Sequence, residues 1–271
     1  MKKKLKIGIA GCGAIGSEVA KAVVTKFKDK AELVALFDIN EDKAIRLSAE
    51  LKKRNLYCNL NALIKRSGLV VEATSQSASC DIVKKALDAH KAALMMSAGG
   101  ILRRPGLSAL AARKRTNLYI PTGAVAGIDG LSAARQGKVK KVTLTTTKPP
   151  RSFKGAPYIK EKKINLGAIK KDIVLFEGSA NAAVRGFPAN INVAATLSLA
   201  GIGAKKTRVR IIASPKVKRN IHEIEIEGDF GRIYTRAENV PSPRNPKTSY
   251  LAVLSAIATL DKITGNVKIG T

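Results

Sequence analysis

The 271-residue sequence has few cysteines, few histidines and no long apolar segment. Its three cysteines, Cys12, Cys58 and Cys80, make neither a disulfide framework nor a metal-ligand cluster, and their odd number favours a reducing compartment. Glycines and Glu18 interrupt the apolar stretch after residues 2–4, which is unlike a signal peptide. No run approaches the ~18 apolar residues of a membrane span. We therefore expect a cytoplasmic protein with neither a bound metal nor a membrane segment.

Acidic residues are also scarce, because 20 Asp and Glu stand against 49 Lys and Arg and give a formal net charge of +29. This excess makes nucleic acid, an anionic membrane or an acidic ligand candidate partners. It is spread evenly, however, with +13 in residues 1–120 and +16 in residues 121–271. A nucleic-acid tail is typically one block of charge. We therefore predict a generally cationic surface and no specific nucleic-acid partner.

With 45% hydrophobic residues, the chain can bury the core of one or two domains. Up to residue 121, short apolar runs alternate with segments of helical periodicity. The apolar runs are residues 5–10, 33–37, 69–71, 92–96 and 118–120, and the helical segments are residues 17–28, 41–54, 78–90 and 107–115. The alternation is typical of βαβ units, and it predicts a doubly wound parallel sheet in residues 1–121.

Beyond residue 121 we expect longer strands with stricter alternation. They cover residues 139–147, 209–213, 221–227 and 232–236, and the last two form a hairpin around residues 228–231. Residues 149–170 are rich in proline and basic residues and predict a long loop, whereas residues 192–199 and 248–260 predict helices. The expected fold class is α/β, with an α+β mixed-sheet domain over residues 122–245 and a C-terminal helix, about 246–271, that packs back on the first domain.

A glycine motif marks the first predicted turn between strand and helix. Gly11, Gly13 and Gly16 form G-x-G-x-x-G with Cys12, Ala14 and Ile15 between them, directly after a strand and at the start of a helix. The first glycine permits the tight turn, the second lets a pyrophosphate approach the backbone, and the third lets the helix pack on the strand. This context predicts a dinucleotide-binding domain of the Rossmann type.

The expected coenzyme is NAD. Asp38 ends the second strand, where a carboxylate can accept hydrogen bonds from the adenosine ribose hydroxyls. The same carboxylate repels the extra phosphate of NADP, and Ile39 and Asn40 supply no arginine to receive it. Lys43 or Arg46, one turn later, can supply such a contact, so use of NADP stays open.

Several segments resemble the archaeal and bacterial L-aspartate dehydrogenases. They are residues 72–76 (EATSQ), 97–100 (SAGG), 123–129 (GAVAGID), 176–180 (FEGSA), 187–198 (FPANINVAATLS), 220–223 (NIHE) and 245–250 (NPKTSY). The resemblance therefore extends over nearly the whole chain. Residues 190–198 and the NIHE tetrad are specific to this family, whereas many dehydrogenases share the glycine loop.

The resemblance implies NAD(P)-dependent oxidative deamination of L-aspartate, through iminoaspartate, to oxaloacetate and ammonia, at the start of NAD biosynthesis. It also implies an N-terminal Rossmann domain, a C-terminal α+β domain that carries the active site, and a homodimer. Carried onto the matching positions, the catalytic residue is His222, and NAD contacts fall on Ala124 and Asn190. The partners implied are thus a small dicarboxylate amino acid and a second copy of the chain.

His222 can also be judged from its strand alone. The alternation places it on one face with Ile224 and Ile226, while three glutamates occupy the other face. A histidine on an apolar face is more often a core residue. It is, however, one of only two histidines, and an imidazole is suited to proton transfer.

Five residues, Asn190 among them, are candidates for contact with the substrate or coenzyme. Asn190 and Asn192 precede a helix, which they can cap, or they can direct an amide and backbone N–H groups at a ligand. Lys247 and Thr248 can likewise hold a carboxylate or cap the last helix. Lys148, at a strand end, is a further cation for a substrate with two carboxylates.

Two other functions stay open at this point. One is a reductase of related architecture, such as a dihydrodipicolinate reductase or a homoserine dehydrogenase. The other is a basic nucleic-acid-binding protein on a dinucleotide fold.

Overall fold

The computed structural model describes residues 3–102, 104–188, 191–243 and 245–270, without the side chains of residues 246 and 247. The chain forms two compact units. Unit 1 comprises Met1–Pro121 and Val253–Ile269, and unit 2 comprises Thr122–Ala252 and Gly270–Thr271. Among the described residues, no helix is long and apolar enough to cross a membrane.

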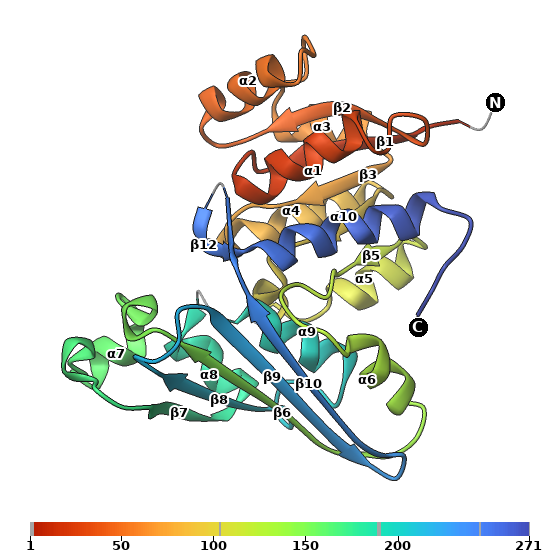
Figure 1. The fold of residues 1–271 in the computed structure, drawn as a ribbon. Helices are drawn as coiled ribbons and strands as arrows, with labels where there is room; N and C mark the ends of the chain where they lie inside the picture. Colours follow the sequence, from red (N-terminus) through yellow and green to blue (C-terminus); the bar gives the residue numbers. More distant parts are fainter. Residues whose placement is uncertain (1–2, 103, 189–190, 244, 271) are drawn as a thin grey trace. The chain divides into compact units, whose positions relative to one another are not determined.

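Unit 1 contains a parallel five-stranded sheet in the order β2-β1-β3-β4-β5 (Figure 1). The strands are β1 (Leu5–Ala10), β2 (Ala31–Phe37), β3 (Leu69–Glu72), β4 (Ala92–Met95) and β5 (Leu118–Tyr119). The helices are α1 (Ala14–Val24), α2 (Glu41–Glu50), α3 (Leu60–Arg66), α4 (Gln76–Asp88), the 3-10 helix η1 (Ala98–Leu102), α5 (Leu107–Arg113) and most of α10 (Tyr250–Thr264).

The strand order reverses between β1 and β3. A single parallel bridge, Leu36 to Tyr57, extends the sheet beyond β2. When this bridge is counted as a vestigial strand, the order is 3-2-1-4-5-6, which is that of doubly wound dinucleotide-binding sheets. The loops after β1 and β3 therefore lie side by side at the carboxyl edge of the sheet, where such folds bind their ligands. The predicted doubly wound sheet is confirmed.

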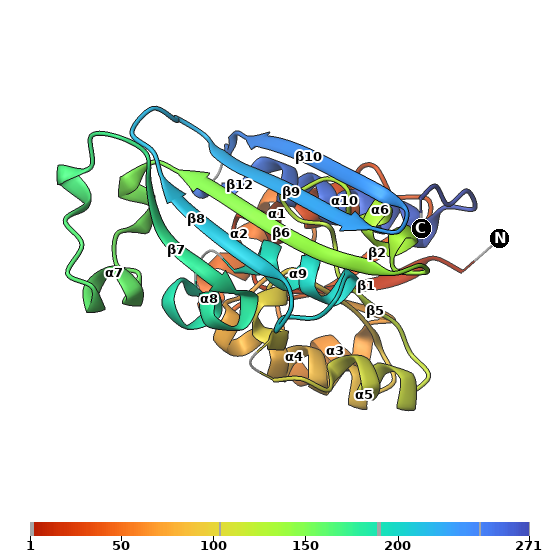
Figure 2. The same cartoon turned by 90° about the horizontal axis from the view of Figure 1, so that it is seen from below.

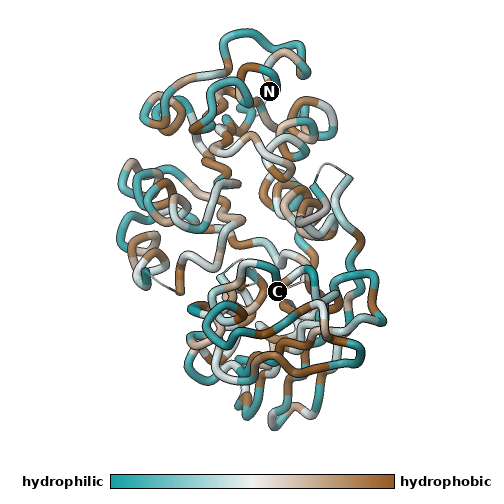
Figure 3. The backbone as a smooth tube through the Cα atoms, turned by 90° about the vertical axis from the view of Figure 1, so that its left-hand side faces the viewer, coloured by the Kyte–Doolittle hydropathy of each residue, from teal (hydrophilic) through white to brown (hydrophobic). Residues whose placement is uncertain are grey.

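The core of unit 1 is built from distant parts of the sequence. Ile7, Ile9 and Leu36 of the sheet pack with Ala256 and Leu260 of α10 in one buried cluster. Figure 3 shows segments of hydrophobic residues in the interior of unit 1 and segments of hydrophilic residues in its outer loops. The last helix is thus an integral part of the first unit.

Unit 2 contains a mixed five-stranded sheet in the order β10-β9-β6-β8-β7, with helices α8 and α9 along one face (Figure 2). Only β6 and β8 are parallel neighbours. The strands are β6 (Val139–Lys148), β7 (Ile173–Ser179), β8 (Arg208–Ala213), β9 (Asn220–Gly228) and β10 (Gly231–Asn239), with the separate pair β11 (Pro241–Ser242) and β12 (Asn245–Ser249). The helices are α6 (Ile128–Ala134), α7 (Pro157–Glu161), α8 (Ala180–Gly186) and α9 (Asn192–Ala200). The predicted mixed sheet is confirmed, as is the hairpin of β9 and β10.

Several segments differ from expectation, and helices α3, α6 and α8 were not predicted. The predicted loop 149–170 contains α7 and two 3-10 turns, where Phe153 and Tyr158 pack against Phe187. Strand β7 was not expected, because it is an edge strand whose first residues, Ile173 and Val174, are exposed. Residues 245–249 form β12 rather than the start of the last helix, and α10 covers only Tyr250–Thr264.

Candidate functional site

The glycine turn after β1 leaves room for a ligand at the start of α1. Gly11 has φ +97°, and a Cβ there would lie 2.4 Å from the Ala73 carbonyl oxygen. A Cβ on Gly16 would lie 1.8 Å from the Gly11 carbonyl oxygen, so α1 packs directly on the turn. A Cβ on Gly13 would meet nothing within 4 Å. Gly13 is the N-cap of α1 and Ala14 its first residue, so the helix N-terminus faces open space suited to an anion.

A crevice of about 500 Å³ runs past this turn along the carboxyl edge of the sheet. Its lining includes Gly11, Gly13, Asp38, Lys43 and the β3 loop at residues 73–75. The Asp38 carboxylate accepts hydrogen bonds from the Cys12 N–H at 2.8 Å and the Asn40 N–H at 3.0 Å. The carboxylate is thus fixed beside the turn by two backbone donors.

These residues fit a dinucleotide. The open position at Gly13 and the N-terminus of α1 suit a pyrophosphate, and Asp38 suits the ribose hydroxyls. Lys43 lies in the same lining, so a cation is available for an additional phosphate. Ile15 follows Ala14 in the first turn of α1 and is half-buried against the core.

Unit 2 carries a second polar site, on the buried face of its sheet. Along β6, Val142 and Leu144 are followed on the same face by Thr146 and Lys148, all four of them buried. Strand β9 runs antiparallel to β6 and places His222 directly opposite Thr146. The Thr146 hydroxyl and His222 Nδ1 are hydrogen-bonded at 2.9 Å. An apolar face therefore ends in a threonine, a lysine and a histidine.

The predicted face of His222 is confirmed, since Ile224 and Ile226 are buried with it. Its pKa is lowered to about 3 by burial and by the nearby charge of Lys148. Burial likewise lowers the pKa of Lys148 to about 8. The hydrogen bond engages Nδ1, so proton exchange with a ligand falls to Nε2. The site thus combines a neutral imidazole with an amine that titrates near physiological pH.

Sequence reasoning missed Thr146. Its signal is the period of two along β6, in which a polar side chain occupies a position of the apolar face. The contact itself cannot be found from the sequence, because the residues are 76 positions apart and meet only through the β6–β9 pairing.

The other predicted site residues take no part in the Thr146–His222 hydrogen bond or lie outside the described residues. Ala124 is buried in unit 2, and its carbonyl oxygen accepts a hydrogen bond from Asn239 Nδ2 at 3.0 Å. Asn192 is the first residue of α9 and Ile191 is its N-cap, so of the two roles left open for Asn192 the N-cap position is not the one it occupies. Thr248 lies in β12 rather than at the N-terminus of α10, so it does not cap that helix. Asn190 and the Lys247 side chain lie outside the described residues.

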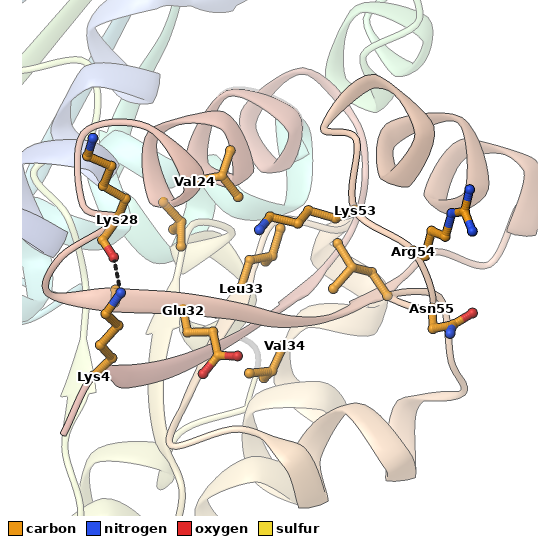
Figure 4. A pocket seen from close by; sticks show the side chains of 12 residues that line it. Lys4, Val24, Lys28, Glu32, Leu33, Val34, Lys53, Arg54 and Asn55 are labelled. Atoms are coloured by element: carbon orange, nitrogen blue, oxygen red, sulfur yellow. Dashed lines mark hydrogen bonds between the residues drawn. The ribbon is translucent and has the colours of Figure 1, made fainter.

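A hollow of about 640 Å³ lies at the amino end of β2, away from the glycine turn. Lys4, Lys28, Lys53 and Arg54 surround an apolar floor that includes Leu33 (Figure 4). Figure 4 shows the charged ends of Lys28 and Arg54 at opposite ends of the hollow, and Lys4 donates instead to the Lys28 carbonyl oxygen at 2.6 Å. In a ligand site the polar groups converge on one point, but the cations of this hollow do not.

In the described part of the chain, no group of three or more His, Cys, Asp or Glu side chains could hold a metal ion.

Two family models match the two parts of the sequence. The NAD-binding domain of homoserine dehydrogenase matches residues 11–121, and the C-terminal domain of aspartate dehydrogenase matches residues 129–263. The first match supports the predicted NAD(P) coenzyme. Among solved structures, the aspartate dehydrogenase of Thermotoga maritima shares the fold, with a TM-score of 0.73, 23% identity and coverage of 99% of this chain and 100% of that one.

Full-length relatives give the family. The L-aspartate dehydrogenase of Methanosarcina mazei is 50% identical over 98% of this chain and 100% of its own. That of Nitrosopumilus maritimus is 40% identical over 98% and 99% of the two chains. L-aspartate dehydrogenase 3 of Bordetella bronchiseptica is 35% identical over 100% and 99%. Identities of this size over whole chains show that the protein belongs to the aspartate dehydrogenase family.

Proposed function

We propose that the protein catalyses the NAD(P)-dependent oxidative deamination of L-aspartate, through iminoaspartate, to oxaloacetate and ammonia. The observation that carries the proposal is the buried Thr146–His222 pair with Lys148 beside it, in a chain that is 50% identical to a named L-aspartate dehydrogenase. The pair supplies a proton acceptor and the lysine a cation, which are the two groups that deamination of an acidic amino acid requires.

The crevice of unit 1 is the proposed coenzyme site. The backbone N–H groups at the start of α1 bind the pyrophosphate, and Asp38 accepts hydrogen bonds from the adenosine ribose. When bound, the nicotinamide supplies the acceptor for the hydride that leaves the substrate Cα.

His222 is the proposed general base for hydrolysis of the imine. Its ring is neutral in the free protein, because burial and Lys148 lower its pKa to about 3. Nε2 can therefore accept the proton of the attacking water and then pass it to the departing amine. Thr146 is proposed to hold the ring in one orientation by accepting a hydrogen bond from Nδ1–H, which leaves Nε2 as the proton acceptor.

Lys148 is the proposed partner of a substrate carboxylate. A buried ammonium group gains most from an anion that enters the same low-dielectric site. Burial is the main cause of the low His222 pKa, and the carboxylate offsets the second cause, the positive charge of Lys148, so substrate binding raises that pKa.

The test is NADH formation from aspartate, glutamate and alanine by the wild-type protein and by His222→Ala. We expect turnover with aspartate, and a fall in kcat by about 10²–10⁴ in the variant with little change in NADH affinity. His90→Ala is the matched control, because His90 is the other histidine and is exposed on unit 1. Equal turnover of the wild type and His222→Ala would remove the base assignment. Equal use of all three amino acids would remove the substrate assignment.

A further inference from the structure

Glu72, the last residue of β3, is fully buried in unit 1 and carries an ionisable group that the proposed chemistry does not use. One carboxylate oxygen accepts hydrogen bonds from the Thr74 N–H at 2.7 Å and the Thr74 hydroxyl at 2.8 Å. The other accepts from the Ser97 N–H at 3.1 Å. All three donors point at oxygen lone pairs, as an ionised carboxylate requires.

These bonds join two loops at the carboxyl edge of the sheet. Thr74 belongs to the loop after β3, and Ser97 follows β4. The Ser97 hydroxyl donates to the Thr74 carbonyl oxygen at 2.8 Å and closes a ring of contacts between the loops. Burial raises the pKa of Glu72, and the donors from Thr74 and Ser97 oppose that shift. The carboxylate is thus a connector between neighbouring strand ends.

The β3 loop is a wall of the coenzyme crevice. Ala73, Thr74 and Ser75 line the crevice together with Asp38. A Cβ on Gly11 would lie 2.4 Å from the Ala73 carbonyl oxygen and 3.0 Å from Thr74 Cγ2, so the glycine turn rests on this loop. A displacement of the loop would move the surface against which the turn is packed.

We propose that Glu72 is a positioning residue for the coenzyme. Its hydrogen bonds link the loop of Thr74 to Ser97 and so fix the position of this loop against the glycine turn. The inference rests on coenzyme binding in this crevice. It assigns Glu72 an effect on coenzyme affinity through Thr74, and none on the substrate site of unit 2.

Glu72→Gln tests the connector without a change of volume. The amide oxygen can keep the contacts with Thr74, but the amide N–H₂ then faces the Ser97 N–H, and two donors cannot bond. Ser97→Ala is the milder second variant, since it removes the hydroxyl contacts of Ser97 with Thr74 and Glu72 but keeps the bond from its backbone N–H to Glu72. Val70→Ala is the matched control, because Val70 is a buried residue of the same strand outside the crevice lining.

The measurement is a fluorescence titration of the full-length protein with NADH, together with steady-state kinetics and thermal unfolding. We expect the Kd of NADH to rise about tenfold in Glu72→Gln and about threefold in Ser97→Ala, since tenfold corresponds to about 1.4 kcal/mol and to the loss of about one buried hydrogen bond. The kcat at saturating NAD and the KM for aspartate should stay within about twofold. Val70→Ala should unfold at a lower temperature yet bind NADH like the wild type.

Several results would overturn the inference. One is a wild-type Kd in Glu72→Gln, and another is an equal rise in Val70→Ala, which would make the effect one of general stability. If Glu72→Gln does not fold, Ser97→Ala decides, and an unchanged Kd there overturns the proposal. Failure of the wild-type protein to bind NADH is a different outcome, because it contradicts the coenzyme site itself.

Discussion

Binding of succinate, an unreactive dicarboxylate, to the NADH-saturated protein should take up protons, and the uptake should grow as the pH rises from 7 to 9. The cause is Lys148, whose pKa burial lowers to about 8. A carboxylate placed beside the amine favours its charged form and raises that pKa again. Succinate binding and protonation of Lys148 are therefore linked.

The size of the effect follows from that pKa. With a pKa of about 8, the free amine is about 90% charged at pH 7, about 50% at pH 8 and about 10% at pH 9. Complete charging in the complex thus takes up about 0.1, 0.5 and 0.9 protons at these three pH values. If only the charged form binds, affinity falls about tenfold between pH 7 and pH 9. His222 adds little, because its pKa starts at about 3.

The assay is isothermal titration calorimetry in Tris and in HEPES, whose ionisation enthalpies differ, so that the difference in heat reports the protons exchanged. Lys148→Met should abolish the uptake and weaken binding. Lys141→Met is the matched control, since Lys141 is an exposed lysine of the same strand that pairs with Glu225 and Glu227. Uptake that does not increase from pH 7 to pH 9, or that persists in Lys148→Met, would refute the reasoning.

Three further outcomes are expected. Lys148→Met should raise the free energy of unfolding by about 3 kcal/mol at pH 7, because burial of the charged amine destabilises the folded state and methionine carries no charge. In urea titrations this gain should shrink between pH 8 and pH 10.5, where the amine of the unfolded wild-type chain also loses its charge. Asp38→Ser should raise the KM for NAD about tenfold and lower the ratio of kcat/KM for NAD to kcat/KM for NADP, both measured by steady-state kinetics with each coenzyme. Gly16→Ala should lower the free energy of unfolding by about 1–3 kcal/mol and weaken NADH binding, because the added Cβ would meet the Gly11 backbone. An unchanged melting temperature and an unchanged Kd for NADH would contradict the tight packing of α1 on the turn.

Local patterns predicted the parts of this structure that depend on neighbouring residues. The glycine motif predicted a turn that leaves Gly13 open, and the alternation around His222 predicted its buried face. Both follow from spacing along one or two elements.

Contacts between distant strands could not be predicted in the same way. The hydrogen bond of Thr146 to His222 depends on β6 lying beside β9, and the contact of Glu72 with Ser97 depends on β3 lying beside β4. Strand β7 also gave no clear pattern, because an exposed edge strand lacks a continuous apolar face. Pairing partners are a property of the whole sheet and leave little trace in local sequence.

The position of α10 has a consequence for biosynthesis. Ala256 and Leu260 complete a hydrophobic cluster whose other members come from the first hundred residues of the chain. Ribosomes deliver the N-terminal part first, and domains generally fold as units. The nucleotide-binding unit must therefore wait, with part of its interior uncovered, until α10 (Tyr250–Thr264) has been synthesised. In this chain the strands of unit 1 are made before unit 2 but reach their mature packing only after unit 2 has been synthesised.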